Sequence, residues 1–274
     1  MRRPLRRANG PGGMRAALDA AAIPTFNGPR EMAASAEAIR FMRSPGWLPR
    51  GRRVYAIGDI HGCPDKLNAL HRLIAADFTV RSTGSAILVH LGDAIDQGPD
   101  SAGVVALLSA GPPIPGLAVV NLLGDHERML LDGLSGDRAA ATDWLWAGGN
   151  EALASWGLSP DLPREAWESA LPAAHLAWLR GLSLTHREGS YLFVHAGIRP
   201  GVPLAEQSRD DLVTMRQPFL SNEQDHGLIV VHGHSSTPSV HVGPNRIGLD
   251  TGAGIGGKLT CAVLEDDLIG LLAV

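Results

Sequence analysis

The chain has 274 residues, of which 45% are hydrophobic and 19% charged. This composition suits one large globular domain or two small ones and excludes a disordered main body. The formal net charge is −4, but residues 1–53 hold eleven arginines against three acids, so the rest of the chain carries about −12. A net negative charge over residues 54–274 is expected for a protein that binds cations through clustered carboxylates, and it argues against a nucleic-acid-binding surface.

The two cysteines, Cys63 and Cys261, exclude several classes of site. They form no CxxC pair and are too few for a disulfide framework, so we expect ordinary thiols in a reducing compartment. No run of eighteen apolar residues is present, and the arginine-rich N-terminus lacks the apolar segment of a secretory signal. We therefore expect a cytoplasmic protein without a membrane partner.

Residues 1–50 form a basic extension rich in proline, glycine and arginine, which we expect to be loosely attached to a catalytic domain over 51–274. Within the extension, residues 31–43 favour one short helix. A docking role and a dispensable or mis-annotated start, with Met14 as an alternative first residue, both remain open.

The first half of the domain alternates strands with helices. Strands are predicted at 54–57, 86–91 and 117–123, and helices at 65–77, 101–109 and 127–132. Pro64 suits the first position of the first helix. The continuous apolar runs at 86–91 and 117–123 are typical of strands buried on both faces.

Residues 135–185 predict a small helical insert, in which helical patches alternate with prolines. Five tryptophans occur here, and we expect them to serve as core rather than as ligand platforms: Trp144, Trp146, Trp156, Trp167 and Trp178. Beyond the insert, strands are predicted at 191–194, 228–231, 246–250, 258–264 and 268–273, with a helix at 209–215.

One pattern occurs five times. An apolar strand ends in a tight, glycine-bearing turn that carries Asp or His: GDIHG, GDAIDQG, GDHE, HAG and HGHS. Because loops at the carboxyl ends of parallel strands lie together in α/β architectures, these side chains are expected to converge. The glycines allow the backbone to turn sharply beneath each side chain.

Carboxylate and imidazole are the ligands of hard and borderline divalent cations. Asp93 is the natural bridge between two cations about 3.5–4 Å apart. The first cation takes Asp59, His61 and Asp93, and the second takes Asp93, Asp125, His195 and His234. Without cysteine in these turns, manganese is the first expectation, with iron, zinc or magnesium as alternatives.

Such a pair of cations generates hydroxide near neutral pH for in-line attack on phosphorus. His126 follows Asp125 but should point elsewhere, so it is the candidate general acid. Asp96 is expected to hold its imidazole and raise its pKa. A guanidinium is also expected to clamp the phosphate.

Taken together, GDIHG, GDAIDQG, GDHE, FVHAG and VHGHS resemble the PPP-type metallophosphatases, and the bacterial and phage serine/threonine protein phosphatases in particular. The resemblance covers residues 53–265 and extends to MRQPFLS, PNRIGLDTGA and GGKLTCAVL. It implies a four-layer αββα sandwich of two mixed β-sheets, with the metal site on strand-end loops. It also implies the ligand set above, His126 as the acid with Asp96 as its partner, and Arg216 as a phosphate-binding residue. Related diadenosine tetraphosphatases have the same frame.

Two residues depart from the family pattern. Asp125 stands where the family has Asn, and Gln97 stands where it has Arg. Both changes reduce the attraction for phosphate, and one lost charge-assisted contact costs about 1.5–3 kcal/mol. Arg128 is a candidate to replace the missing arginine in part.

The other histidines are not expected in the site, although His232 is kept as a neighbour of the ligands. Three functions remain. The first is a phosphatase acting on phosphoserine and phosphothreonine in proteins. The second is a small-molecule phosphohydrolase such as a diadenosine tetraphosphatase. The third is a weakened binding or regulatory homologue. The sequence does not predict an oligomeric state.

Overall fold

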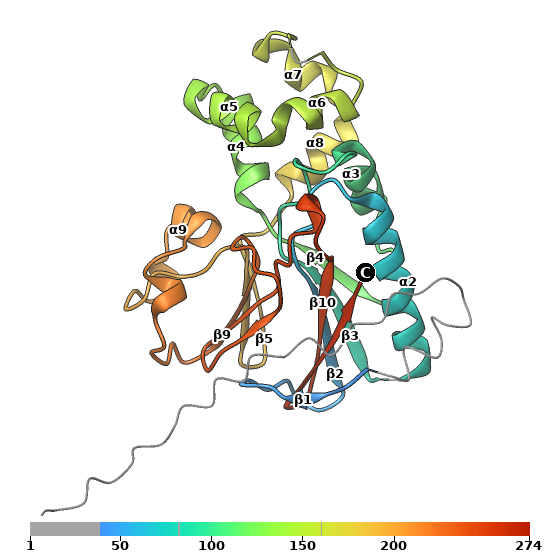
Figure 1. The fold of residues 1–274 in the computed structure, drawn as a ribbon, viewed down its shortest axis with the longest axis vertical. Helices are drawn as coiled ribbons and strands as arrows, with labels where there is room; N and C mark the ends of the chain where they lie inside the picture. Colours follow the sequence, from blue (N-terminus) through green and yellow to red (C-terminus); the bar gives the residue numbers. More distant parts are fainter. Residues whose placement is uncertain (1–38, 82, 160) are drawn as a thin grey trace, which may run out of the picture.

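The computed structural model describes residues 39–81, 83–159 and 161–274 (Figure 1). Six strands form the first mixed sheet, in the order β1-β11-β10-β2-β3-β4. Their bounds are β1 Met42–Arg43, β11 Leu268–Ala273, β10 Thr260–Glu265, β2 Arg52–Ile57, β3 Ser85–His90 and β4 Ala118–Asn121. The strands β2, β3 and β4 run parallel, so their carboxyl ends lie at one edge.

The second mixed sheet has five strands in the order β5-β6-β7-β9-β8. Their bounds are β5 Thr185–Glu188, β6 Tyr191–Val194, β7 Ile229–His232, β9 Arg246–Gly248 and β8 His241–Val242. The strands β6, β7 and β9 are parallel, which again places three carboxyl ends side by side.

The helices lie outside this pair of sheets. Their bounds are α2 Pro64–Val80, α3 Ser101–Ser109, α4 Asp125–Leu134, α5 Arg138–Trp144, α6 Asn150–Ser155, α7 Arg164–Ala170, α8 Ala173–Arg180 and α9 Arg209–Thr214. Short 3₁₀ segments occur at Leu204–Glu206, Phe219–Ser221 and Ala253–Ile255, and a π-helical turn, η1, at Leu145–Gly149. Within the described residues, none of the helices is long and apolar enough to cross a membrane.

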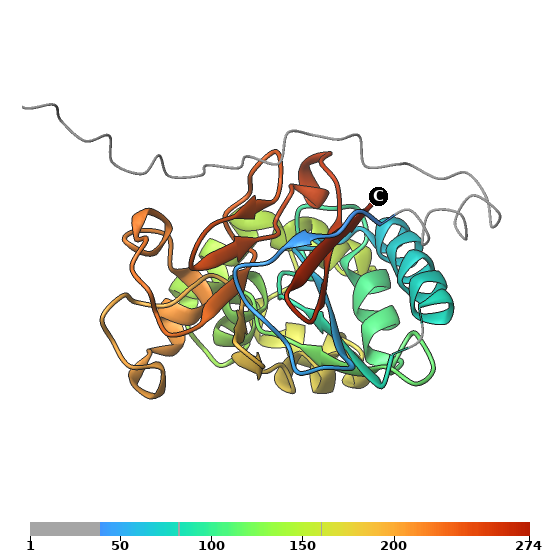
Figure 2. The same cartoon turned by 90° about the horizontal axis from the view of Figure 1, so that it is seen from below.

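The alternation of side chains along β2 explains the layers. Tyr55 and Ile57 pack with α2 and α3, whereas Val54 and Ala56 pack between the two sheets against the inner face of β6 and β7. The outer face of the second sheet is covered by α9 and the segment around Phe219. The four-layer αββα sandwich is therefore confirmed, and the view turned by 90° again places α2 and α9 on opposite sides of the strands (Figure 2).

Helices α5 to α8 occupy residues 138–180, inside the range where the sequence predicts an insert, and lie beyond the strand ends (Figure 1). Trp144 and Trp167 are buried at its centre, with ring centroids 5.2 Å apart, and Trp156 and Trp178 pack against the same cluster. The prediction of a core tryptophan is wrong for Trp146, whose side chain is 87% exposed.

The predicted helix over 31–43 is wrong where the structure describes it, since residues 39–43 are not helical. Met42–Arg43 instead forms β1, paired antiparallel with β11, because the edge of β11 offers unpaired backbone groups. Leu48 is buried between the sheets, so residues 39–50 are packed onto the domain rather than loosely attached. Residues 31–38 of that helix lie outside the described residues.

Candidate active site

The predicted site residues meet at the adjoining carboxyl edges of the two sheets. Asp59 and His61 follow β2, Asp93 follows β3, and Asp125 is the first residue of α4 after β4. From the second sheet, His195 follows β6 and His234 follows β7. A cavity of about 390 Å³ opens here. Six of the predicted residues line it: His61, Asp93, Asp125, His126, Arg216 and His234.

Asp93 lies at the centre of the cluster. Its Oδ2 atom is 3.6 Å from Nε2 of His61, 3.4 Å from Nε2 of His195 and 4.0 Å from Nε2 of His126. Asp93 consequently belongs to two groups with metal-ligand spacing, one with His61 and His126 and one with Asp125, His195 and His234. A carboxylate common to two groups is the arrangement that a pair of cations requires.

Asp125 completes the second group. Its Oδ1 atom lies 3.0 Å from Nε2 of His195 and 2.9 Å from Nδ1 of His234. Although burial opposes ionisation, the hydrogen bonds of both histidines hold the pKa of Asp125 well below its usual value. A cation bound here would take the place of these two hydrogen bonds, with Asp125, His195 and His234 as its ligands.

Two imidazoles are oriented for coordination by backbone carbonyls. Nδ1 of His61 is 3.0 Å from the carbonyl oxygen of Ile95, and Nδ1 of His195 is 2.8 Å from that of Leu91. When Nδ1–H donates to these carbonyls, the Nε2 lone pair of each ring faces the cluster, as in protein metal sites.

Asp59, predicted as a ligand of the first cation, belongs to neither of these two groups. Oδ2 accepts a hydrogen bond from the backbone N–H of His234 at 2.8 Å, while Oδ1 is buried without a partner. An orphaned carboxylate oxygen costs free energy unless a cation or water satisfies it. The donor set thus fits two divalent cations, with oxygen and imidazole nitrogen ligands and no thiol.

Backbone strain concentrates at the same place. Five of the six non-glycine residues with positive φ among the described residues belong to these turns: His61, Asp93, Asp96, Gln97 and His234. Such conformations cost on the order of 1–3 kcal/mol each and persist where the surroundings impose them. The turns are therefore shaped for the site at the expense of stability.

Glu127 is a supporting residue to which the sequence reasoning gave no role. Its buried carboxylate accepts from the backbone N–H groups of Asp93, Ala94, Ile95 and Gly124 at 2.7–3.1 Å. Burial and then the charge of Asp93 raise the pKa of Glu127 to about 7. Glu127 therefore connects the turn after β3 to the start of α4. In the sequence, the feature that could have identified it is its place as the last residue of the GDHE motif.

Gly124 allows these turns to approach closely. A Cβ atom at this position would lie 2.0 Å from Oδ1 of Asp93. Any side chain here would displace the carboxylate that both ligand groups require.

His126 and Asp96 form a buried pair beside the first ligand group. Nδ1 of His126 is 2.7 Å from Oδ2 of Asp96. Burial alone lowers the pKa of His126, but the charge of Asp93 and the hydrogen bond of Asp96 outweigh it and raise the pKa to about 10. Burial also raises the pKa of Asp96, to about 6. The pair holds a proton on an imidazole that faces the cavity.

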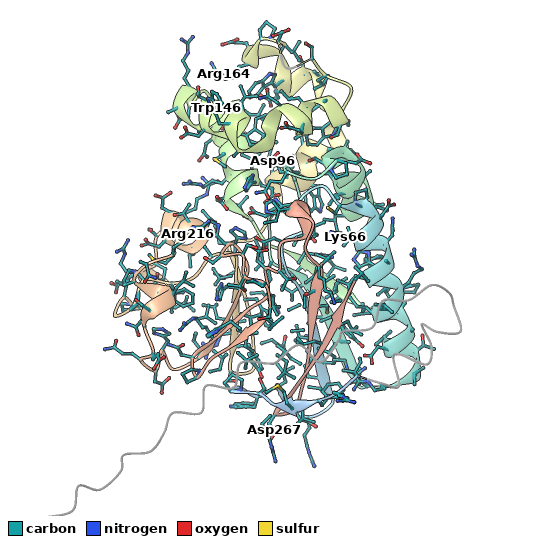
Figure 3. All side chains as sticks on the ribbon, in the orientation of Figure 1. Lys66, Asp96, Trp146, Arg164, Arg216 and Asp267 are labelled. Atoms are coloured by element: carbon teal, nitrogen blue, oxygen red, sulfur yellow. The ribbon has the colours of Figure 1, made fainter. Side chains whose placement is uncertain are left out.

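Three side chains bear on phosphate binding. Arg216 lines the cavity, with Nη2 3.3 Å from the carbonyl oxygen of His234, and lies near α9 in Figure 3. Nε2 of Gln97 is 3.5 Å from Nε2 of His126. Arg128 forms an ion pair with Asp210 and is not among the cavity-lining residues, which argues against its replacing the missing arginine.

Asp250 is a second residue that the sequence reasoning missed. It lines the cavity two residues beyond β9, in the segment GLDTGA. Ser236, Gly252 and Ile255 also line the cavity. His232, expected as a neighbour of the ligands, is buried and does not line the cavity; its Nδ1 is 2.9 Å from the carbonyl oxygen of Gly233.

Comparison with known proteins gives consistent relatives. A protein named serine/threonine-protein phosphatase 1, from Salmonella typhimurium, is 30% identical over 227 residues, covering 78% of this chain and 93% of its own length. A symmetrical bis(5'-nucleosyl)-tetraphosphatase from Methylococcus capsulatus is 32% identical over 151 residues. That match covers 54% of this chain, and the chain spans only 44% of the length of that relative.

One solved structure superposes on this chain with a TM-score of 0.58, and the activity proposed for that protein is that of a diadenosine tetraphosphatase. It is 26% identical and covers 81% of this chain and 92% of its own. The family model described as calcineurin-like phosphoesterase matches residues 52–263, which include every predicted ligand. The chain belongs to the calcineurin-like phosphoesterase family and, within it, resembles the PPP-type enzymes.

Proposed function

We propose that this metal-dependent phosphoesterase hydrolyses phosphoserine and phosphothreonine in proteins. Support comes from the serine/threonine-protein phosphatase of Salmonella typhimurium, which this chain matches over 93% of its length. The relatives named as tetraphosphatases are of similar identity, so the choice between substrates rests on the cavity.

The charge of the cavity is the observation that carries the proposal. Among the residues that line it, Arg216 is the one lysine or arginine, whereas Asp93, Asp125 and Asp250 are acidic. A phosphomonoester presents one phosphate group, which a single guanidinium and the cations can neutralise. Each phosphate of a dinucleoside tetraphosphate adds negative charge, so that substrate needs more basic side chains than line this cavity.

Two divalent cations, manganese by our proposal, would be held by Asp59, His61 and Asp93 and by Asp93, Asp125, His195 and His234. When bound, they supply Lewis acidity toward the phosphate and toward water. Arg216 contributes bidentate donors to the phosphate oxygens. The fixed position of each ligand on a strand-end turn confines the phosphate to the cavity.

His126 acts on the leaving group. As water replaces the alkoxide on phosphorus, the oxygen of the departing serine or threonine takes the proton from Nε2 of His126. Asp96 holds Nδ1 of the same ring and stabilises the imidazolium before transfer. The distance of 2.7 Å between Nδ1 and Oδ2 supports this assignment.

A substrate panel tests the proposal. Activity with added manganese is compared on a phosphoserine peptide, p-nitrophenyl phosphate and diadenosine tetraphosphate. We expect kcat/KM to be highest for the peptide and lowest for the tetraphosphate. A tetraphosphatase is the second candidate, favoured by the relatives of that name and by the solved structure with a TM-score of 0.58. A preference for the tetraphosphate would establish that candidate and overturn ours.

A further inference from the structure

We infer that Asp250 belongs to the site of the first cation, where its carboxylate holds the water ligands of that cation. This inference rests on the proposed metal centre but not on the identity of the substrate. No ligand role was predicted for Asp250 from the sequence, since the expected strand over 246–250 placed this residue inside a strand.

The position of Asp250 repeats the pattern of the other ligands. The strand β9 is parallel to β7, and it ends at Gly248, so Asp250 emerges at the edge that also carries His234. The backbones of the two sheets meet at this point, because a Cβ atom on Gly58 would lie 2.4 Å from the carbonyl oxygen of Leu249. Asp250 thus emerges beside Asp59, which follows Gly58.

Asp250 is a buried carboxylate with no cationic partner in the described residues. Its side chain is 4% exposed, and Oδ1 accepts the backbone N–H of Gly252 at 2.9 Å. None of the ion pairs in the described part of the chain includes it. Lys66, which ties the following loop to α2, donates to the carbonyl oxygens of Ala253 and Gly257 instead.

The charge of Asp250 acts on the two residues that are assigned to the first cation alone. After burial, it is the next cause that raises the pKa of Asp59. Burial lowers the pKa of His61, and the charge of Asp93 and, to a smaller extent, that of Asp250 oppose this lowering. Two neighbouring buried carboxylates repel each other, and Oδ1 of Asp59 is buried without a partner. A cation bound between Asp59 and Asp250 would offset the repulsion between the two carboxylates and would give Oδ1 of Asp59 a partner.

The carboxylate of Asp250 acts through water rather than as a direct ligand. Asp59 and Asp250 are both absent from the two groups of side chains whose ligand atoms lie within 4.8 Å of one another. Oδ1 of Asp250, however, already accepts the backbone N–H of Gly252, whereas Oδ1 of Asp59 has no partner and is free to bind a cation directly. Manganese and magnesium suit oxygen ligands that include water, and a carboxylate that accepts hydrogen bonds from these water ligands strengthens binding. We therefore expect Asp250 to favour these cations at the first site and to leave the second site unchanged.

The test is titration of metal-free protein with Mn²⁺ by calorimetry, comparing wild type, Asp250→Asn and Asp267→Asn. Asparagine keeps the oxygen that accepts from Gly252 and removes only the charge. Asp267 is the matched control, because it is half-exposed, pairs with Arg43 and lies at the lower end of the molecule, away from Asp96 (Figure 3). Asp250→Ser is a second uncharged variant with an oxygen acceptor, in case the asparagine variant folds poorly.

The wild type and Asp267→Asn are expected to bind two ions with the same two affinities. In Asp250→Asn, one affinity is expected to fall about 10–100-fold while the other is retained. Two unchanged affinities, or an equal loss in both, would overturn the role of Asp250 and leave the phosphoesterase assignment intact. If the wild type binds no Mn²⁺, the metal centre itself is wrong, and the inference falls with it.

Discussion

Nδ1 of His126 lies 2.7 Å from Oδ2 of Asp96, and the turn that carries Asp96 has a positive φ at that residue. The strained backbone therefore aims a carboxylate at the ring that we propose as the general acid. His126→Asn should lower kcat for a phosphoserine peptide by about 10²–10⁴-fold. Asp96→Asn should give a smaller loss, because the imidazole remains but loses its orienting partner.

The leaving group separates catalysis from a merely structural role. p-Nitrophenolate departs without protonation, so His126→Asn should lose much less activity on p-nitrophenyl phosphate than on the peptide. Measured kcat ratios for both substrates provide the check. Equal losses on both would show that His126 does not protonate the leaving group.

The second prediction concerns Gln97, which stands where the family has arginine. Its amide already lies 3.5 Å from Nε2 of His126 at the cavity, so Gln97→Arg should place a guanidinium against the phosphate. One added charge-assisted contact is worth about 1.5–3 kcal/mol, which corresponds to an increase of kcat/KM by roughly 10–100-fold. Gln97→Lys, which adds the charge without the planar fork, should gain less.

Asp125→Asn tests the other departure. It removes one negative charge between His195 and His234 while keeping an oxygen ligand, and it should increase kcat by raising the Lewis acidity of the cations. Steady-state kinetics with manganese measure both variants. If neither variant nor the wild type hydrolyses any phosphate ester, the chain is a non-catalytic binding or regulatory homologue rather than an enzyme of reduced activity.

The third prediction concerns stability. Arg53, a residue of β2 in the first sheet, is 1% exposed, and its Nε donates to Glu265 at 3.0 Å while its Nη1 donates to the hydroxyl of Tyr55 at 3.1 Å. Asp77, fully buried, lies 3.5 Å from Nη1. Arg81 also pairs with Asp77 at 2.6 Å and with Glu265 at 2.9 Å, so Arg53→Met removes one of two cations from this buried network. It should lower the free energy of unfolding by about 1–3 kcal/mol.

Urea unfolding measures that change, with Arg43→Met as the control. Arg43 pairs with Asp267 at the surface, where its side chain is 79% exposed, so its replacement should change stability by less than about 1 kcal/mol. Similar losses in both variants would contradict the role assigned to the buried network.

The fourth prediction concerns pH. Nε2 of His71 lies 3.2 Å from Nε2 of His90, whose Nδ1 is 2.7 Å from Oδ1 of Asn121. Burial lowers the pKa of His71 to about 4 and that of His90 to about 3. Since both rings bind protons more weakly when folded, their contribution is complete above the usual pKa of 6.5 and is lost as the pH falls toward 4 and 3.

Each ring contributes a slope of up to about 1.4 kcal/mol per pH unit in that window. His71→Leu should therefore show a shallower fall of stability between pH 6.5 and 4 than the wild type. Urea midpoints of both proteins across this range, with a chelator present, measure the two slopes. Identical slopes would mean that His71 does not titrate as described.

The strand-end ligands were predictable because local sequence determines them. Each lies in a glycine-bearing turn that follows an apolar run, and parallel strands bring such ends together wherever the fold is α/β. Asp250 was missed because the short strand β9 ends two residues earlier than its apolar pattern indicates. Glu127 was missed because its role, accepting four backbone N–H groups, exists only once the turn after β3 meets α4.

Where the sequence prediction of the fold is wrong, the position of the residues within the folded structure explains the difference. Residues 39–43 have helical periodicity, but Met42 and Arg43 pair with β11, whose edge provides hydrogen bonds that an isolated helix turn lacks. Trp146 lies in the turn η1 only two residues after the buried Trp144, and two residues along a helix place side chains on opposite faces, so Trp146 is exposed. The expectation of five core tryptophans did not take this spacing into account.

The proposed metal centre depends on one carboxylate, that of Asp93, which both cations would share. Anomalous diffraction from crystals grown with Mn²⁺ tests this sharing most directly. The predicted result is two anomalous peaks about 3.5–4 Å apart, both in contact with Asp93, one beside Asp59 and His61 and the other beside His195 and His234. A single peak, or peaks that do not contact Asp93, would contradict the dinuclear centre.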